Sequence, residues 1–424
     1  MNTDDSGTAS GQGLDGPLAG VLVTDLSTVL AGPYCTMLLA DLGADVVKVE
    51  PPEGDPTRRY GPPYAGPTDD ETGYPGESGY YLSTNRNKRG IRLDLHTADG
   101  RGVLERLIAR SDVLVENLRP GSLDRLGFGE AALEELNRSL VHLSISGFGR
   151  SGPDQHKPGF DFIIQALSGL MSITGQPDDE GGQPTKVGVA VTDLTTGMLG
   201  AVAVLAGLRA RDAHPERHGE RVDISLLGGS IAWLINQASN YLVGGEVPGR
   251  MGNRHPNITP YETFRTADGE IAVAVGSERQ WHRFCVAIER PELADDPRFL
   301  NNDHRIRERE ALRTILARRI EQRSTDDWVA VLSAAEVPVG QIRDMAQVFA
   351  DPQVQQLGMV VEVEHPTIGT LRQTGIPWQL SRHPGGIRRA APLLGQHQDE
   401  VLQELGYSAV QIARMRDDGP AKDR

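Results

Sequence analysis

The sequence is poor in cysteine. Its two thiols, Cys35 and Cys285, lie far apart along the chain and form no C-x-x-C pair. This pattern argues against a disulfide framework and a zinc site, so we expect reduced thiols and a cytoplasmic protein. Residues 1–13 (MNTDDSGTASGQG) lack the apolar core of a signal peptide, and the longest apolar run falls short of a bilayer span. We therefore expect neither export nor a membrane anchor.

Basic charge is also scarce. The chain has 43 Lys and Arg against 58 Asp and Glu, which gives a formal net charge of -15. Such a balance opposes nonspecific attraction to nucleic acid or anionic lipid, so we expect neither as a partner. An anionic ligand would have to meet a local basic cluster. No Ser stands in a G-x-S-x-G motif, so the sequence offers no anchor for a serine hydrolase.

The length of 424 residues exceeds what one hydrophobic core usually organises, so we expect two domains of unequal size. In the first half, strand and helix signals alternate with short connections, which predicts an α/β domain with a mostly parallel, doubly wound sheet. Ligands of such sheets bind at the carboxyl ends of the strands. The predicted strands are 21–27, 45–50, 90–95, 112–117 and 140–146, and the predicted helices are 32–42, 97–110 with Thr97 as its cap, and 129–136.

The second half changes character. A helical region over 225–241 is followed by a Gly/Pro/Asn-rich loop over 244–260, a strand over 270–275 and charged amphipathic helices to about 336. This pattern predicts a smaller domain. Short strands over 358–364 and 369–374 then precede a terminal segment, 417–424, that we expect to be frayed.

Two local patterns resemble sites but lack the necessary context. Residues 147–152 read GFGRSG, a formal dinucleotide fingerprint, yet Pro153 and the following loop leave no helix to receive a pyrophosphate. His214 and His218 have the i, i+4 spacing of a metal pair, but Pro215 and charged neighbours place them on a solvated connector. We therefore expect neither an NAD site nor a metal site.

Asp193 stands at a change of pattern. It ends a β-branched run over 187–192 and precedes an apolar stretch, 197–208, that predicts a helix closed by Arg209 and Arg211. Asp is among the preferred helix N-cap residues because its side chain accepts from free backbone N–H groups. From these residues alone, a helix cap is a simpler interpretation than a catalytic group.

The surrounding text favours catalysis. Residues 158–175 (PGFDFIIQALSGLMSITG) and 186–197 (KVGVAVTDLTTG) resemble the family III CoA-transferases, including the CaiB/BaiF and formyl-CoA transferase-like proteins. In that family the aspartate matching Asp193 is the nucleophile. The resemblance extends over nearly the whole chain through six further landmarks in the same order: 30–34 (LAGPY), 41–50 (DLGADVVKVE), 85–94 (NRNKRGIRLD), 115–121 (VENLRPG), 144–149 (SISGFG) and 250–261 (RMGNRHPNITPY).

The resemblance implies an architecture. It places a large, CoA-binding Rossmann-like domain at both chain ends, over 15–224 and 340–414, and a linker helix with a smaller α/β domain over 225–339. Residues 1–14 and 415–424 would be flexible tails. The family also implies an interlocked, ring-like homodimer with the active site close to the dimer interface.

The resemblance also implies a chemistry and a site. Asp193 would attack an acyl-CoA, forming a mixed anhydride and then an aspartyl-CoA thioester, with no ATP, metal or prosthetic group. We expect the position of Asp193 at a helix N-terminus to favour its anion. Arg125 and Lys157 would supply positive charge for the CoA phosphates. The implied CoA-binding residues are Thr28, Val29, Leu30, Ala31, Leu93, Asp94, Leu95, His96, Asn117, Leu118, Ser122, Arg125, Leu126 and Lys157.

Some positions remain open. Arg125 could be only the last-turn cation of a short helix, and Arg86, Lys88, Arg89 and Arg92 are most simply a solvated rim. The chain departs from family members that have Arg after the second strand, where it has Pro51-Pro52, and from those with Gln at the position of Leu30.

Two alternative functions also remain. The first is a racemase of the same fold. Such racemases have a His-Asp pair at the position where this chain has Phe160-Asp161. Phenylalanine cannot move a proton, which favours transfer. A non-catalytic acyl-CoA-binding protein is the other alternative. Residues 252–261 (GNRHPNITPY) look most like transferases that use succinyl-CoA and short dicarboxylic acids. We hypothesise that Arg254 or His255 meets the remote carboxylate of the substrate and that the loop over 249–257 covers the site.

Overall fold

The computed structural model describes residues 16–71 and 73–417. The chain forms two compact units. The first contains the segment up to Ser168, Gly188–Ile235 and the chain from Pro352 onward, and the second contains Gly169–Val187 and Asn236–Asp351. The expected tails over 1–14 and 418–424 lie outside the described residues, whereas 415–417 belong to the last helix, α18 (Ala409–Asp417).

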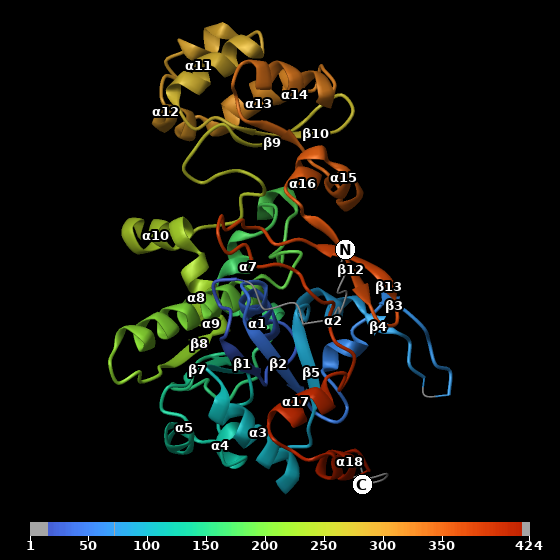
Figure 1. Cartoon of the computed structure of the whole chain (residues 1–424). Coiled ribbons are helices and arrows are strands. Elements are labelled where there is room, and N and C mark those ends of the chain that lie inside the picture. The colour runs from blue at the N-terminus through green and yellow to red at the C-terminus, as the bar shows by residue number, and fades with distance from the viewer. Residues whose placement is uncertain (1–15, 72, 418–424) are drawn as a thin grey trace, which may run out of the picture. The chain divides into compact units, whose positions relative to one another are not determined.

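The first unit is built around a parallel six-stranded sheet, which confirms the predicted sheet type (Figure 1). Its strand order is β5-β2-β1-β6-β7-β8. The chain therefore adds strands outward from β1 on one side and then, beginning with β6, on the other. The strands are β1 (Leu22–Asp25), β2 (Asp45–Glu50), β5 (Lys88–Arg92), β6 (Val113–Glu116), β7 (Val141–Ser146) and β8 (Arg221–Ser225).

This order reverses direction between β1 and β6, and a loop follows each of these two strands at the carboxyl edge of the sheet. Open α/β sheets bind ligands where the strand order reverses, outside the carboxyl ends of the strands. In this chain the two loops at that point are residues 26–30 and 117–121. The topology alone therefore identifies the part of the sheet where a ligand is expected.

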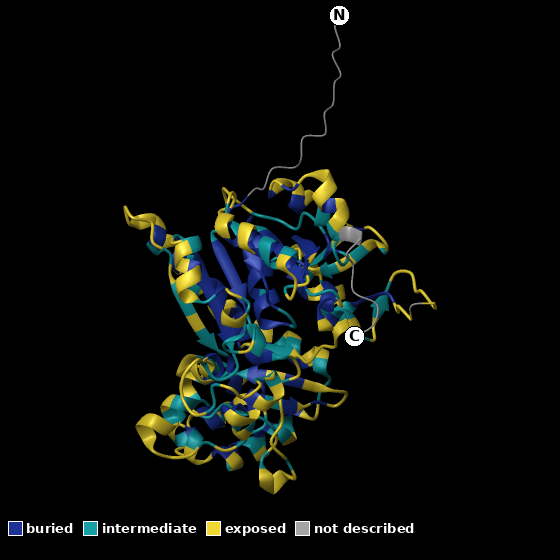
Figure 2. Cartoon of the chain, turned by 90° about the horizontal axis from the view of Figure 1, so that it is seen from below, coloured by how far each residue is buried: buried dark blue, intermediate teal, exposed yellow. Residues whose placement is uncertain are grey.

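Apolar side chains cover both faces of the sheet, because adjacent residues of a strand point to opposite sides. Val46 packs in a core with α1 (Ala31–Asp41) and α8 (Val191–Ala213), whereas its neighbour Val47 packs in a second core with α3 (Ala98–Arg110). Strands β1, β2, β5, β6 and β7 form the mostly buried, dark-blue centre of this unit, whereas β8 at the edge of the sheet is partly exposed (Figure 2). Thr97 caps α3 through the N–H of Gly100 at 3.0 Å, as predicted.

Shorter elements complete the first unit. They are η1 (Pro56–Arg59), β3 (Tyr64–Ala65), β4 (Glu77–Ser78), α2 (Gly79–Thr84), α4 (Ser122–Arg125), α5 (Glu130–Leu136), α6 (Asp161–Leu167), α9 (Leu226–Trp233), α16 (Pro352–Gln356), β12 (Val360–His365), β13 (Gly369–Thr374), α17 (Gln398–Glu404) and α18.

The second unit has an antiparallel sheet of order β11-β10-β9 and a core rich in aromatic rings, including Trp281, Phe284 and Trp328. Its elements are α7 (Leu170–Ile173), η2 (Asp178–Glu180), β9 (Tyr261–Arg265), β10 (Glu270–Ala274), α11 (Glu278–Ala287), η3 (Pro291–Ala294), α12 (Asn302–Arg307), α13 (Arg309–Ile320), α14 (Thr325–Ala334), β11 (Val339–Gln341) and α15 (Met345–Ala350), with α10 (Ile235–Gly244) beginning at the boundary.

Helix α8 is longer than the sequence predicts. It begins at Val191 rather than at residue 197 and continues past Arg209 and Arg211 to Ala213. It has 23 residues, and an 18-residue stretch of it has a mean hydropathy of 1.6, so by length and composition alone it could cross a membrane, although the longest apolar run was expected to be too short. A core helix can have the same length and composition as a membrane span. Helix α8 packs in the core of the first unit through Ala201, Val204 and Leu208.

Candidate active site

Asp193 occupies the first turn of α8, which begins two residues earlier. Ala190 is the N-cap residue and makes no side-chain capping bond, so the interpretation of Asp193 as the helix cap is wrong. The partly buried carboxylate instead accepts a hydrogen bond from the backbone N–H of Ala31, the first residue of α1. Two helix N-termini therefore meet at Asp193, and each brings the positive end of a helix dipole.

Small residues allow this close approach of α8 to α1. A Cβ atom on Gly197 would lie 2.6 Å from the carbonyl oxygen of Ala31, and one on Gly200 would lie 3.5 Å from the sulfur of Cys35. Since the first distance is shorter than real Cβ contacts, a larger residue at position 197 would push the two helices apart. The glycine thus keeps the Ala31 N–H within reach of the carboxylate.

Burial and, second, the negative charge of Asp161 raise the pKa of Asp193 to about 7, while the hydrogen bond from the Ala31 N–H opposes both. The dipole was expected to favour the anion, but it contributes only about 0.3–1 kcal/mol, which desolvation exceeds. The carboxylate is therefore close to half ionised at neutral pH. Perturbed carboxylates of this kind concentrate at functional sites.

Two further side chains interact electrostatically with Asp193: the carboxylate of Asp161 and the hydroxyl of Tyr80. Asp161 begins α6, and its Oδ1 accepts from both the N–H and the Oγ1 of Thr192, at 3.0 and 2.9 Å. Tyr80 lies on α2, where burial and then the charge of Asp193 raise the pKa of its hydroxyl to about 12. Neither residue was predicted as a site residue, since each lies far from Asp193 in sequence.

Hydrogen bonds join the predicted CoA loop after β1, residues 26–30, to the loop after β6. The N–H of Thr28 donates to Oδ1 of Asn117 at 2.9 Å, and Nδ2 of Asn117 donates back to the carbonyl of Thr28 at 2.8 Å. The structure thus brings together two of the predicted CoA segments, from opposite sides of the β1/β6 reversal. Val29 adopts a φ of +68°, which is costly for a β-branched residue.

A buried network of charges lies beneath this loop. Nζ of Lys48 donates to the carbonyl of Ser27 and to Oδ2 of Asp55, both at 2.9 Å. Oδ1 of Asp55 in turn accepts from the N–H of Val29 at 3.4 Å. Loop residues 27, 28 and 29 therefore each have a backbone bond to a partner outside the loop.

A second buried pair joins β1 to β5. Nζ of Lys88 donates to Oδ2 of Asp25 at 3.0 Å and to the carbonyl of Pro33 at 2.8 Å, at the start of α1. Burial lowers the pKa of Lys88 to about 8 even though Asp25 opposes this effect. Burial alone would raise the pKa of Asp25, but Lys88 and Lys48 outweigh it and lower the pKa to about 2.

These contacts correct the interpretation of the basic run as a solvated rim. Lys88 is fully buried, Arg86 pairs with Asp41 at 2.7 Å, and Arg89 pairs with Asp45 at 2.6 Å. Of the four cations, Arg92 is the one that is exposed. The run consequently serves the interior of the first unit rather than a surface that attracts anions.

The other predicted CoA residues follow the carboxyl ends of β5, β6 and β7. Leu93 is buried, and Asp94 accepts from the N–H of His96 at 2.9 Å, with Leu95 between them. These residues lie at the carboxyl edge of the sheet. Ser122 accepts from Arg125 at 2.7 Å at the start of α4, Leu126 packs against the second core, and Lys157 pairs with Asp154 at 2.8 Å.

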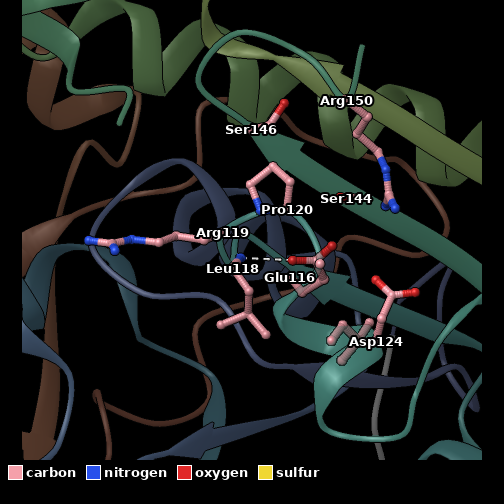
Figure 3. Close-up of a pocket in the computed structure, with 10 residues that line it drawn as sticks. Glu116, Leu118, Arg119, Pro120, Asp124, Ser144, Ser146 and Arg150 are labelled. Carbon is pink, nitrogen blue, oxygen red and sulfur yellow. Dashed lines mark hydrogen bonds between the residues drawn. The ribbon is translucent and has the colours of Figure 1, made fainter. Parts of the chain in front are cut away.

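A small polar pocket adjoins these residues at the ends of β6 and β7. Oε2 of Glu116 accepts from the N–H of Leu118 at 2.7 Å, and Arg119 extends away from Glu116 (Figure 3). Ser144 and Arg150 line the pocket from β7 and the loop after it. Sequence reasoning missed Glu116, Ser144 and Arg150, although the strands that carry Glu116 and Ser144 were predicted.

Arg254 and His255, the residues suggested for the substrate carboxylate, lie in the second unit. Arg254 pairs with Glu180 at 2.8 Å and with Glu310 at 3.3 Å. The ring of His255 packs on Tyr261 with centroids 5.1 Å apart. Burial, together with the charge of Arg309, lowers the pKa of His255, so its ring is mostly neutral at pH 7.

The two misleading sequence patterns have the expected surroundings. No helix or strand follows GFGRSG until α6 begins at Asp161, as predicted. His214 ends α8, and His218 is exposed on the connector, also as predicted. In the described part of the chain, no group of three or more His, Cys, Asp or Glu side chains is placed to hold a metal ion.

Comparisons with known proteins agree over most of the chain. Residues 18–398 match a family model described as CoA-transferase family III. The chain is 40% identical to the succinyl-CoA:glutarate CoA-transferase of Homo sapiens, over 92% of this chain and 86% of that protein. It is 41% identical to the succinate--glutarate CoA-transferase of Agrobacterium fabrum, over 92% and 96% respectively. The crystal structure of a CaiB/BaiF family protein from Brucella suis superimposes with a TM-score of 0.80 at 38% identity, over 92% of this chain and 100% of that one.

Proposed function

The chain belongs to CoA-transferase family III, and we propose that it moves CoA from succinyl-CoA to a short dicarboxylic acid with Asp193 as the nucleophile. The donor and the acceptor class follow two relatives, which are named as CoA-transferases for succinyl-CoA or succinate and glutarate. The observation that carries the proposal is the setting of Asp193: a carboxylate that pairs with no cation among the described residues and is held by a backbone N–H where two helices begin.

This setting suits attack on a thioester. One carboxylate oxygen of Asp193 bonds to the donor acyl carbon and expels CoA thiolate, which gives a mixed anhydride. The thiolate then attacks the aspartyl carbonyl, releasing succinate and leaving an aspartyl-CoA thioester. The acceptor carboxylate attacks this thioester and again expels the thiolate. That thiolate takes the acceptor acyl group from the second anhydride and frees Asp193. Every step exchanges one activated acyl group for another, so the sequence of steps balances without ATP.

The Ala31 N–H has a second use in this scheme. It faces the carboxylate of Asp193 and is therefore positioned to donate to the oxyanion that develops at the aspartyl carbonyl when the thiolate attacks. A single good donor of this kind contributes roughly 3–4 kcal/mol to the transition state. The tight packing at Gly197 would then serve the reaction as well as the fold.

We place CoA along the carboxyl edge of the sheet, with the loop after β1 and the segments after β5, β6 and β7 as its contacts. The β1/β6 reversal supports this position, since ligands of doubly wound sheets bind there. Arg125 and Lys157 stay the predicted partners of the phosphates, and both side chains reach solvent. Either would have to leave a local partner, Ser122 or Asp154, to bind the nucleotide.

For the acceptor, Arg254 stays the predicted partner of the remote carboxylate. Its present partners, Glu180 and Glu310, are carboxylates, which is the group that a dicarboxylic acid would offer in their place. The test is Arg254→Ala, which should raise KM about tenfold or more for dicarboxylic acceptors and little for monocarboxylic ones. Arg250→Ala is the matched control, because Arg250 lies on the same loop and pairs with Asp178. An equal rise in KM for both acceptor classes would exclude this role.

We also propose that two chains form the interlocked homodimer typical of the family, in the cytoplasm. Support comes from an exposed apolar surface near Asp161 and Asp193, on α6 and α8, because large apolar patches usually mark interfaces. Phe162, Ile163, Leu167, Met198, Leu199 and Val202 contribute to it. Light scattering coupled to size exclusion should give twice the mass of the 45.9 kDa chain.

The decisive experiment is a CoA-exchange screen, with succinyl-CoA and acetyl-CoA as donors and a panel of carboxylic acids, read by mass spectrometry. Asp193→Asn should lower exchange at least about 10⁴-fold, since the lost group is the nucleophile. Binding of CoA should change little, which tryptophan fluorescence or calorimetry can measure. Undiminished exchange by this variant would exclude the proposed nucleophile. Incubation with an α-methylacyl-CoA in deuterated water tests the racemase alternative, which predicts deuterium uptake without transfer.

A further inference from the structure

Asp161 contacts the first turn of α8 from a different helix. Its Oδ1 accepts from the backbone N–H of Thr192 at 3.0 Å and from the Thr192 hydroxyl at 2.9 Å. Its Oδ2 accepts from Nε2 of Gln165 at 2.8 Å, one turn further along α6. The first N–H groups of a helix lack partners within the helix, and Ala190 supplies no side chain to satisfy them. Asp161 therefore performs, from α6, the task of an N-cap residue for α8.

The geometry of these bonds leaves Asp161 little freedom. Both of its oxygens are engaged, and both partners, Thr192 and Gln165, are buried. Thr192 directly precedes Asp193 in the chain. By holding Thr192, Asp161 therefore also restrains the backbone of the proposed nucleophile, Asp193.

Asp161 also acts on Asp193 through space. Its negative charge is the largest influence on the pKa of Asp193 after burial, and it acts in the same direction. The other groups that face Asp193 are Tyr80 on α2 and the Ala31 N–H of α1. Tyr80 in turn interacts with Tyr60 and Asp55. The groups that shift Asp193 include no cation, so the charge of Asp161 is not offset there.

We infer that Asp161 is a positioning residue for the transfer reaction: through its two bonds to Thr192 it fixes the first turn of α8, which carries Asp193. Its negative charge adds to the effect of burial and raises the pH above which Asp193 attacks the acyl-CoA. This inference rests on the proposed function of Asp193. Asp161 itself forms no bond with substrate. Its two effects oppose each other near neutral pH, because the bonds that hold the turn in place bring a negative charge with them.

The two effects can be separated by substitution. Asp161→Asn keeps an oxygen that accepts from Thr192 and removes the charge. The acid limb of kcat/KM for CoA exchange should then move to lower pH by about one unit or more, since a like charge near a carboxylate disfavours ionisation. Asp161→Ala removes the charge and the bonds together. It should also show the shifted limb, with a plateau at least about tenfold lower because the turn is no longer held.

Asp268 provides a matched control. Its Oδ1 accepts from the N–H and Oγ1 of Thr325, the first residue of α14, at 2.8 and 2.9 Å. It thus makes the same pair of bonds to a helix start in the second unit. Asp268→Asn should leave the acid limb where it is in the unmodified protein. If Asp161→Asn does not accumulate as folded protein, Asp161→Ser serves instead, because its hydroxyl accepts from Thr192 without a charge.

The experiment records kcat/KM between pH 5 and 9 for the unmodified protein and these variants, with succinyl-CoA as donor. In parallel, peptide mass spectrometry on the unmodified protein checks that an acyl or CoA adduct forms on Asp193. An acid limb that moves in Asp161→Asn and stays in Asp268→Asn supports the inference. An unmoved limb in folded Asp161→Asn, while the unmodified protein forms the adduct, overturns it. Absence of any Asp193 adduct in active protein overturns the proposed function instead.

Discussion

Asp25 and Asp193 are two carboxylates of the first unit that titrate in opposite directions. Asp25 ends β1 and is fully buried, yet its pKa is lowered to about 2, because Lys88 and Lys48 outweigh the cost of burial. Asp193 is less buried, yet its pKa is raised to about 7, because it has an acid and a backbone N–H as neighbours but no cation. The cations near the carboxyl end of β1 are thus committed to the scaffold, and the carboxylate of the site is left unpaired.

The buried charges around Asp25 and Asp55 have a structural role. The network around Asp25 and Asp55 fixes the loop after β1 and the start of α1, so that the Ala31 N–H keeps its place beside Asp193. A cation at Asp193 would make the carboxylate a weaker nucleophile by stabilising its anion. The proposed reaction therefore needs both features: ion pairs that fix the loop after β1, and a carboxylate at Asp193 without a cation beside it.

The first prediction concerns the buried ion pair between Lys88 and Asp25. Lys88→Met leaves Asp25 buried with one of its two cations removed, and breaking a buried pair in this way costs about 3–5 kcal/mol of unfolding free energy. Urea denaturation measures the loss. The control is Lys186→Met at an exposed lysine, which should change stability by less than about 0.5 kcal/mol. Equal stability of the two variants would refute the structural role of the pair.

The second prediction concerns the site side. In the folded chain the pKa of Asp193 is about 7, above its ordinary value of 3.8. The folded state therefore binds more protons than the unfolded state between these values, and stability falls as the pH rises from about 4 to 7. Asp193→Asn removes this loss. The variant should be more stable than the unmodified protein at pH 8, by up to about 4 kcal/mol, while it loses exchange activity.

Denaturation curves at pH 4 and pH 8 check this slope. Asp326→Asn serves as the control, because Asp326 also lies in the first turn of a helix, α14, but is exposed. It should keep the pH dependence of the unmodified protein within about 0.5 kcal/mol. If Asp193→Asn is no more stable at pH 8 than the unmodified protein, the carboxylate is not held at a raised pKa.

The third prediction concerns the contact between the two helices. Gly197→Ala places a Cβ 2.6 Å from the carbonyl oxygen of Ala31, and such overpacking costs about 1–3 kcal/mol. Displacement of α1 should also lengthen the bond from the Ala31 N–H and reduce exchange. Gly188→Ala is the control, since a Cβ there meets no atom within 4 Å. Thermal unfolding and exchange rates of both variants give the comparison, and similar values for the two would refute the close-packing account.

The sequence predicted the parallel sheet well, because local signals specify it. Strand β2 has the predicted bounds, Asp45–Glu50, and Thr97 caps α3 as its position suggested. The start of α8 could not be predicted in the same way. Its cap is Asp161, thirty-one residues earlier, and the local sequence around Ala190 contains no trace of this contact.

The charged residues show the same limit. Arg86, Lys88 and Arg89 look like a surface run because their partners, Asp41, Asp25 and Asp45, lie on other elements. Asp193 was singled out by its resemblance to a family, whereas its raised pKa depends on burial and on Asp161. Local sequence therefore predicted many of the elements, and the family resemblance singled out Asp193, but the long-range ion pairs and the electrostatics around Asp193 required the folded arrangement.

The most direct test of the account is to find the covalent intermediate. Active protein is incubated with succinyl-CoA, quenched and digested, and the peptides are mapped by mass spectrometry, with Asp193→Asn as the matched control. The account predicts a CoA or succinyl adduct on the peptide that carries Asp193 and no adduct in the variant. An active preparation that forms no adduct, or forms it on another residue, would contradict the account.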